Sequence, residues 1–274
     1  MRDRFLLAVV VGGFITATLA SQSGTHLNRV IDLLAAHKPV FGVYAPRNPR
    51  TRPGATVPDT ARLKTPTELA KDALGYMRAD YVFDGSTEGD YDRAFPAFSE
   101  FAKGIAEGGG GMIERNGATR FHHPLIVKVH EIAPDPAKAT QHIGDQLNLG
   151  VSGVVFVGVE SKAGLARVRE IAAVQGIGVL FPGAGTLRGV FTTTDANGQR
   201  VFDEKGWEAA IQQVLAACKE FNVPCGYPAT ANDIEARMQQ GFSVFVINWG
   251  EQGFKAVDIG RRVGNRESGI GNRE

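Results

Sequence analysis

Short apolar runs alternate along this sequence with segments that carry helix-start and helix-stop signals. The runs are 39–44 (PVFGVY), 81–83, 125–129 (LIVKV), 154–159 (VVFVGV), 178–181 (GVLF), 224–227 and 243–248 (SVFVIN). They are apolar along most of their length rather than at every second position, which is typical of parallel strands covered on both faces. Strands that alternate with helices predict a parallel sheet, either closed as a barrel or open and doubly wound.

The helical segments between these runs have recognisable ends. Their start signals are a capping box with proline at 65–68, Asp135-Pro136, Asp203, and Thr230 or Asn232. Gly150 and Gly241 are the matching stop signals. A mature chain of about 250 residues with this order has the length typical of a (β/α)₈ barrel.

Residues 1–20 have the pattern of an export signal. A basic start, Met1–Arg4, precedes the uncharged segment 5–20, which is shorter than the about 20 residues of a membrane span. Thr18 and Ala20 occupy the −3 and −1 places for cleavage before Ser21. We therefore expect a signal peptide and an exported protein, periplasmic or secreted; the alternative is a buried N-terminal strand or helix.

Charge and cysteine content exclude several classes of protein. The sequence has 30 Lys and Arg against 29 Asp and Glu, a net charge of +1. A chain with this balance lacks the excess of positive charge that binds nucleic acid. After removal of the signal peptide it also lacks the charge that binds an anionic membrane. Cys218 and Cys225 alone build neither a disulfide scaffold nor a structural zinc site. They either pair with each other or are two small buried side chains.

Several segments do not belong to the alternation. Residues 47–64 are predicted as a long loop, and 108–117 as a flexible insertion rich in glycine. Asn197-Gly198 indicates a hairpin, which we expect to lie as a lid over the carboxyl end of the 178–181 strand. We expect a signal peptide over 1–20, one barrel domain over 21–260 and a disordered tail over 261–274.

Polar residues follow the ends of several predicted strands. In parallel α/β folds, ligands bind where the strands end. Lys128 lies inside an apolar strand, so it must reach a ligand or form a buried salt bridge with Asp84, Glu88 or Glu160. His130 is either an acid–base group or an ordinary polar residue. Glu160 is either an oxygen ligand for Mg²⁺ or Mn²⁺ or a carboxylate near the start of the next helix.

The sequences at the strand ends resemble those of a known family. The segments KPVFGVYAP, ADYVFDG, PLIVKVHEIAPDP, GVVFVGVES, GVLFPGAGTLRG and VPCGYPATANDIEARMQQGFSVFVINWG resemble the HpcH/HpaI aldolase/citrate lyase family over residues 27–261. The resemblance implies a TIM-type (β/α)₈ barrel, a class II pyruvate aldolase or related lyase, and a homo-oligomer. It also implies a divalent metal, Mg²⁺ or Mn²⁺, that binds pyruvate and stabilises its enolate.

The match to the family's functional residues is partial. Glu160 corresponds to the metal-binding Glu, and the turn 183–186 to a Gly-Pro-Ala-Asp turn that holds the substrate carboxylate, with Thr186 in place of the Asp. Lys128 stands where an Arg polarises the carbonyl, and Glu88 where a His is usual. One strand–helix unit is missing between residues 150 and 176. The unpaired strand edges that this leaves need a cover or a second chain.

These observations lead to three hypotheses. The first is an aldolase that cleaves a 4-hydroxy-2-oxo acid, with Glu160 and Asp84 as metal ligands and Lys128, His130 and Glu88 as catalytic groups. Its small 2-oxo acid substrate is held by Gly183, Ala184, Gly185, Thr186, Arg188 and Trp249. The second is a catalytically impaired barrel that binds a small carboxylate. The third is a truncated copy that does not fold stably.

Overall fold

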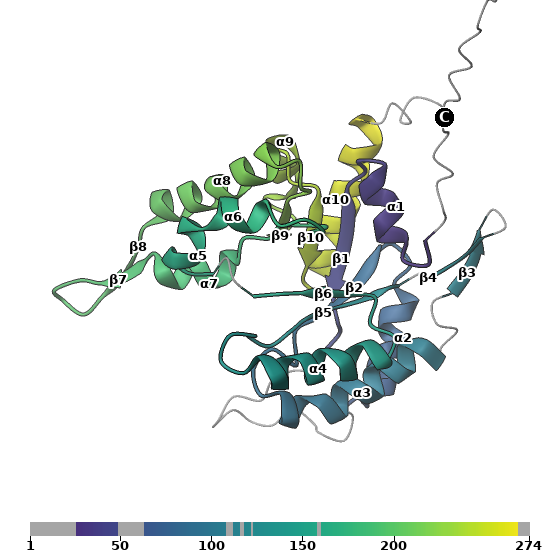
Figure 1. Cartoon of the computed structure of the whole chain (residues 1–274). Coiled ribbons are helices and arrows are strands. Elements are labelled where there is room, and N and C mark those ends of the chain that lie inside the picture. The colour runs from purple at the N-terminus through teal and green to yellow at the C-terminus, as the bar shows by residue number, and fades with distance from the viewer. Residues whose placement is uncertain are drawn as a thin grey trace, which may run out of the picture.

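A curled parallel sheet of six strands forms the centre of the molecule (Figure 1). The computed structural model describes residues 26–48, 63–107, 112–115, 118–121, 123–157 and 160–267. Across the sheet, the strands lie in the order β6 (Gly153–Val155), β5 (Leu125–Lys128), β2 (Tyr81–Asp84), β1 (Val40–Tyr44), β10 (Val244–Ile247) and β9 (Gly226–Ala229). All five ladders are parallel. The carboxyl ends of the strands therefore lie on one side.

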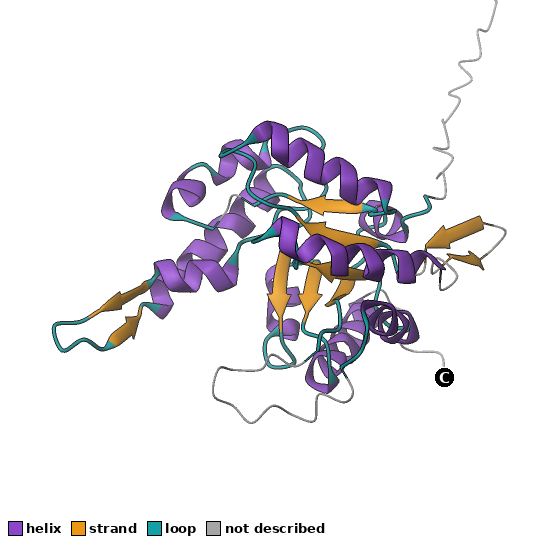
Figure 2. Cartoon of the chain, turned by 90° about the horizontal axis from the view of Figure 1, so that it is seen from below, coloured by secondary structure: helices purple, strands orange, loops and turns teal. Residues whose placement is uncertain are grey.

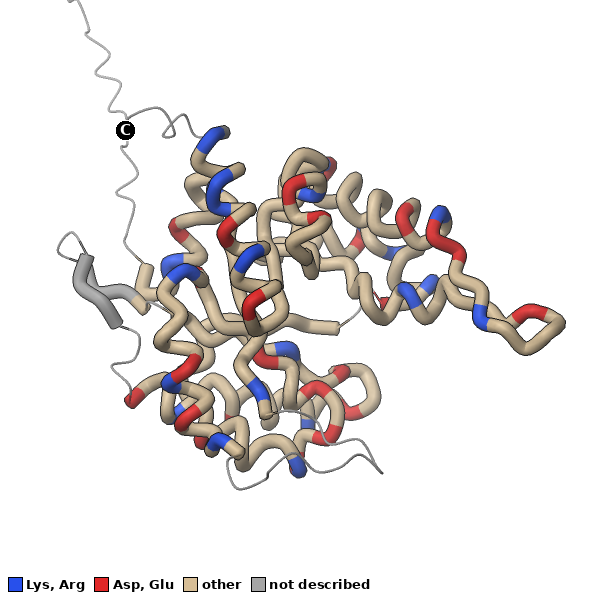
Figure 3. Tube along the Cα trace, turned by 180° about the vertical axis from the view of Figure 1, so that it is seen from behind, with Lys and Arg blue, Asp and Glu red and all other residues tan. Residues whose placement is uncertain are grey.

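Helices surround the curled sheet (Figure 1). They are α1 (Arg29–Ala35), α2 (Pro66–Gly75), α3 (Tyr91–Glu107), α4 (Pro136–Asn148), α5 (Lys162–Ala166), α6 (Val168–Ala172), α7 (Ala184–Val190), α8 (Glu204–Glu220), α9 (Ile234–Gln240) and α10 (Glu251–Glu267). Basic and acidic residues alternate along these helices (Figure 3). None of the helices among the described residues is both long and apolar enough to cross a membrane.

The predicted helix caps are confirmed at most positions. Thr65 and Glu68 form a complete capping box at α2. The side chains of Asp135 and Asp203 each accept a hydrogen bond from the third residue beyond them. Gly241 ends α9 with a φ of 112°, a conformation that favours glycine. The start of α9 differs from the prediction, because its cap position is Asp233.

The interior of the sheet is filled by side chains rather than by an open channel. Tyr81 and Phe181 point inward against two glycines of neighbouring strands. A Cβ atom at Gly42 would lie 2.1 Å from the Tyr81 ring, and one at Gly226 would lie 2.2 Å from the Phe181 ring. Helix α1 packs Val30 into the same cluster at the amino-terminal ends of the strands. The interior is thus a packed core that leaves the carboxyl ends for a site.

The wall of strands is incomplete between β6 and β9. Among the described residues β6 pairs with β5 alone, and the predicted strand 178–181 contributes a single bridge, Leu180 with Cys225. The α/β architecture with a parallel, TIM-like sheet is confirmed. The count of eight strands is not reached in the part of the chain that the structure describes. The predicted run 154–159 is a strand only to Val155, and residues 158–159 lie outside the described residues.

The predicted hairpin is present, but the expected lid is not. Strands β7 (Thr192–Thr194) and β8 (Arg200–Phe202) pair antiparallel around Asn197-Gly198. Both views show this hairpin projecting away from the body of the molecule (Figures 1 and 2). A second hairpin, β3 (Met112–Arg115) with β4 (Ala118–Phe121), lies in the predicted glycine-rich insertion. Residues 108–111, 116–117 and most of the predicted loop 47–64 lie outside the described residues.

The tail prediction is wrong for residues 261–267. Helix α10 continues to Glu267 because Val263 packs, 8% exposed, into the core shared with α8 and α9. Residues 268–274 and the predicted signal peptide, 1–20, lie outside the described residues. The alternative left open for the two cysteines is decided by the structure. Cys218 at the end of α8 and Cys225 before β9 form a disulfide.

Candidate functional site

Lys128 is the last residue of β5, on the side where all six strands end. Its ammonium nitrogen Nζ lies 2.6 Å from Oε1 of Glu88 and 2.6 Å from Oε1 of Glu160. Glu88 comes from the loop after β2, and Glu160 from the segment after β6. The side chain of Lys128 is 18% exposed, that of Glu88 38% and that of Glu160 24%, so the group is accessible from solvent. We call Glu88, Lys128 and Glu160 the ion triad.

The environment of Lys128 keeps its amine protonated. Partial burial is the largest single influence on its pKa and acts to lower it. The hydrogen bonds and negative charges of Glu160 and Glu88 together outweigh burial, so the pKa of Lys128 is raised above its ordinary value of 10.5. Lys128 is therefore an ammonium ion throughout the physiological pH range. The predicted salt bridge is present with two of the three carboxylates considered.

Three sets of contacts hold the loop that carries Glu88. The carboxylate of Asp84 accepts hydrogen bonds from the backbone N–H and the hydroxyl of Ser86. The side-chain amide of Gln146, on α4, donates to the buried hydroxyl of Thr87 at 2.7 Å. The ring Nδ1 of His130 donates to the backbone carbonyl of Glu88 at 2.7 Å. The predicted site residues Asp84 and His130 thus lie beside the ion triad and fix its loop.

The glycine-rich turn lies against Glu160. A Cβ atom at Gly183 would lie 2.3 Å from Cγ of Glu160, so the carboxylate side chain occupies the space that a larger residue would need. Gly185 and Thr186 follow in the first turn of α7, which has no side-chain cap. The N–H of Ala184 donates to the carbonyl of Pro182 at 2.8 Å. The expected convergence of Lys128, Glu160 and the turn is therefore present, but the amide of Ala184 is already used.

Tyr44, the last residue of β1, lies near the ion triad and is absent from the predicted set. Tyr44 ends β1 and packs its ring edge-on against Phe83 at 5.1 Å between centroids. Burial raises the pKa of the Tyr44 hydroxyl, while the charges of Lys128 and Arg47 act to lower it. Tyr44 therefore presents a neutral hydroxyl beside the ion triad. Its position at a strand end is the signal that could have identified it.

Arg188 and Trp249 have their described contacts elsewhere. The guanidinium of Arg188 lies over the ring of Phe202 in the projecting hairpin, 3.8 Å from its centroid. Trp249 packs edge-on against Phe254 of α10 and against Tyr76 at the end of α2. These contacts place Arg188 toward the hairpin and Trp249, two residues after β10, against the ends of α2 and α10. They do not bring either residue to the ion triad.

The residues of this site do not fit a resident divalent metal. No group of three or more His, Cys, Asp or Glu side chains within the described ranges is arranged to hold one. The ammonium of Lys128 lies between the two carboxylates, where a shared cation would be bound. Asp84, the other expected ligand, accepts two hydrogen bonds from Ser86 on one oxygen.

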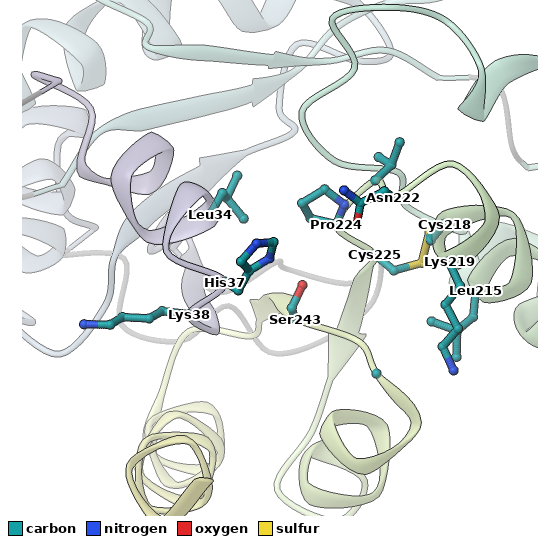
Figure 4. A pocket seen from close by; sticks show the side chains of 12 residues that line it. Leu34, His37, Lys38, Leu215, Cys218, Lys219, Asn222, Pro224, Cys225 and Ser243 are labelled. Atoms are coloured by element: carbon teal, nitrogen blue, oxygen red, sulfur yellow. A yellow bond between two sulfur atoms is a disulfide. The ribbon is translucent and has the colours of Figure 1, made fainter. Parts of the chain in front are cut away.

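Two cavities lie at the opposite end of the sheet. The larger, about 430 Å³, is bounded by Leu34 in the last turn of α1, by Pro224 before β9 and by Ser243 before β10. Figure 4 shows the Cys218–Cys225 disulfide at its wall, with the side chain of Lys38 directed away from it. The second, about 300 Å³, lies by Pro124 and Leu125 at the start of β5. Because ligands of parallel α/β folds bind at carboxyl ends, the ion triad is the candidate site.

Comparison with solved structures identifies the fold. The structure is similar to that of an HpcH/HpaI aldolase/citrate lyase family protein from Burkholderia cenocepacia J2315, with TM-score 0.54, 14% identity, and 89% of this chain and 98% of that chain covered. It is also similar to macrophomate synthase, with TM-score 0.54, 15% identity, and 90% and 91% covered. A third similar structure is CitE from Mycobacterium tuberculosis in complex with magnesium and pyruvate, with TM-score 0.53, 12% identity, and 82% and 90% covered.

At these identities the likeness concerns the fold. The resemblance predicted from the strand ends is confirmed at that level, since the chain folds like HpcH/HpaI aldolase/citrate lyase proteins. No family profile and no curated protein matches the sequence. What the site binds and which reaction it catalyses must therefore be argued from its own residues.

Proposed function

We propose that this chain is a carbon–carbon lyase, an aldolase that cleaves a 4-hydroxy-2-oxo acid into pyruvate and an aldehyde. The observation that carries the proposal is the ion triad: one ammonium and two carboxylates at the carboxyl ends of the strands, beside a tyrosine hydroxyl. The fold supports it, because a similar structure holds pyruvate and magnesium.

The reaction needs one base and one cationic group. A carboxylate removes the proton from the 4-hydroxyl group, the bond between C3 and C4 breaks, and its electron pair becomes the enolate of pyruvate. The ammonium of Lys128 stabilises the negative charge on the enolate oxygen. A proton then returns to C3 and gives the methyl group. Glu88 is the carboxylate that we assign as base, since its side chain is the most exposed of the three, at 38%.

Exchange of the pyruvate methyl protons tests this proposal. The purified protein in deuterated water, with pyruvate and with or without Mn²⁺, should incorporate deuterium into the methyl group, followed by NMR. The variant Lys128→Met should lose this exchange, and Lys138→Met, which removes an ammonium from an exposed pair with Asp92, should keep it. No incorporation above the protein-free rate under any condition would refute the lyase.

A second function is favoured by one specific observation. Both carboxylates near Lys128 are already paired with it, and Thr186 stands in α7 where the resemblance expects an acidic residue. A site that binds a small carboxylate without turnover fits this arrangement. Thermal stabilisation by oxalate together with no methyl exchange would select the binding protein over the enzyme.

We also propose that the protein is exported and works as a homo-oligomer. The Cys218–Cys225 disulfide is a bond that persists in oxidising compartments. Strand β6 has an edge without a ladder partner among the described residues, and Phe156 beside it is 57% exposed. Fractionation of the source cells tests the export, and light scattering of the purified protein tests the assembly.

A further inference from the structure

The two carboxylates of the ion triad share one cation that belongs to the chain itself. Nζ of Lys128 lies 2.6 Å from an oxygen of each. The side chains come from segments after β2, β5 and β6, so three neighbouring strands of one sheet bring them together. A divalent ion bound by the same two oxygens would have to displace the ammonium or lie beside it, against the repulsion of like charges.

We propose that the ammonium group of Lys128 takes the place of a divalent metal in this site, and that it binds a small 2-oxo acid without any metal. The identity of the ligand rests on the proposed function. The exclusion of a metal from between Glu88 and Glu160 does not, because it follows from the three side chains alone.

An ammonium has the donors that this task requires. It carries three N–H groups, of which two are directed to Glu88 and Glu160. The third is available for the oxo or carboxylate oxygen of a ligand. The side chain of Lys128 is 18% exposed, so the ammonium is in contact with solvent but largely shielded from it. The raised pKa of Lys128 keeps the group charged at neutral pH.

Neighbouring groups complete the site for an anion. Tyr44, the last residue of β1, interacts electrostatically with Lys128 and with Arg47, which follows the strand. A hydroxyl and a guanidinium both donate hydrogen bonds to carboxylates. The ligand therefore meets the ammonium of Lys128 with the hydroxyl of Tyr44 near it. In this arrangement Glu88 and Glu160 orient the ammonium.

Metal binding and ligand binding are measured separately to test the inference. Titration of the full protein with Mn²⁺, followed by electron paramagnetic resonance, should show no stoichiometric binding. Oxalate, a planar dianion that resembles the pyruvate enolate, should raise the melting temperature equally with and without a chelator. Lys128→Met should weaken oxalate binding by at least about tenfold, the loss expected for one charged hydrogen bond, and Lys128→Arg should retain most of it.

Three outcomes would overturn the inference. The first is stoichiometric Mn²⁺ binding by the unmodified protein that Glu160→Gln abolishes. The second is a stabilisation by oxalate that disappears with the chelator. The third is covalent attachment of pyruvate to Lys128 after cyanoborohydride reduction, which would make the amine a nucleophile. Should Lys128→Met not fold, Lys128→Arg and Glu160→Gln still give the first two measurements.

The failure of this inference and of the lyase are distinguishable. Methyl exchange that requires Mn²⁺ keeps the lyase and overturns the ammonium as the cation. Oxalate binding without a metal and without any exchange keeps the ammonium and removes the lyase.

Discussion

At Gly183 the missing side chain leaves the space in which Glu160 lies. Its φ of −72° is open to any residue, so the requirement for glycine is one of space and not of backbone conformation. The nearest atom to an added Cβ is Cγ of Glu160, at 2.3 Å. The position of the carboxylate in the ion triad thus depends on this one residue.

The substitution Gly183→Ala should disturb the site while the fold is kept. The added methyl group must displace Glu160 from Lys128, and we expect oxalate affinity to fall by about tenfold, the effect of losing one charged contact. Gly189→Ala, in the same helix α7, is the matched control, because a Cβ there meets nothing within 4 Å. Calorimetric titration of both variants with oxalate measures the difference. Equal affinities would show that Glu160 does not position Lys128.

His142 makes the stability of the protein sensitive to acid. Its ring stacks on Tyr91 at 3.5 Å, and its buried Nδ1 has no hydrogen-bond partner among the described residues. Burial, helped by the charge of Lys138, lowers the pKa of His142 below its ordinary value of 6.5, while Asp92 and Asp145 act to raise it. The folded protein thus holds the neutral ring, and the unfolded chain binds the proton first.

This shift gives a stability that decreases with acidity. The contribution of His142 to the free energy of unfolding is complete above pH 6.5 and falls as the pH drops below it. His142→Phe keeps the stacked ring and removes the titration. We expect urea unfolding to show a smaller difference between pH 7 and pH 5 in this variant. An unchanged difference would assign the acid sensitivity to other groups.

Some residues of the site are predictable from their neighbours in the sequence, and others depend on contacts between distant segments. Lys128 was predictable because a charged residue inside an apolar strand must find a partner, and two of the three predicted carboxylates are its partners. The contact that anchors Glu88, between Gln146 and Thr87, joins residues 59 positions apart. No local pattern indicates such a pair. The ring of Tyr44 fits an apolar strand as well as a functional site, so its residue type alone does not indicate a role for the hydroxyl.

At the scale of elements, the disulfide joins the end of α8 to the start of β9. The Cα atoms of Cys218 and Cys225 are 5.6 Å apart, within the usual range for a disulfide. Both residues are 2% exposed and belong to the main core. The bridge thus fixes the helix to the strand at the edge of the sheet.

Reduction of this bond should weaken the fold by a moderate amount. The loop that it closes is short, with a sequence separation of 7, and chain entropy then gives about 2–3 kcal/mol. Urea unfolding of Cys218→Ala/Cys225→Ala should show a loss of that size. No loss would indicate that the core alone holds this corner.

The elements that were predicted wrongly share a physical cause. The runs 154–159 and 178–181 have the composition of strands, yet a strand needs a neighbour, and the missing unit supplies none. The end of α10 was predicted as disordered because its repeats of Gly, Asn, Arg and Glu are polar. Ala256, Gly260 and Val263 are buried and follow one another at helical spacing, so one face of the helix packs against the core. By contrast, caps such as Thr65 are local and were predictable.

Across the whole molecule, one buried carboxylate joins the first and last described helices to the sheet. Asp80 is fully buried, and its Oδ1 lies 2.9 Å from a guanidinium nitrogen of Arg29 in α1 and 2.8 Å from one of Arg261 in α10. Its other oxygen accepts the backbone N–H of Phe41 at 2.9 Å. Segments distant in sequence thus depend on one side chain.

Asp80→Asn should destabilise the protein strongly. Loss of the charge removes the ion pairs of both arginines, and we expect a fall of about 3 kcal/mol in the free energy of unfolding, the lower end for buried pairs because both arginines partly reach water. Asp72→Asn, in an exposed pair with Lys64, should cost less than about 1 kcal/mol. Urea unfolding of both variants checks this. A single cooperative transition of the unmodified chain would also exclude the hypothesis of a truncated copy that does not fold stably.

The gap between β6 and Leu180 has a consequence for local opening. Amides without a complete ladder exchange with solvent more readily than those of β1, which is flanked on both sides. The two segments at this seam lead directly to Glu160 and to Gly183. A bound anion that holds Lys128 and Glu160 together should therefore slow deuterium uptake at 153–155 and 178–181 and leave 40–44 unchanged. Local opening of the sheet and access to the ion triad are then the same motion. A ligand that binds more tightly should therefore slow deuterium uptake in these two segments to a greater extent.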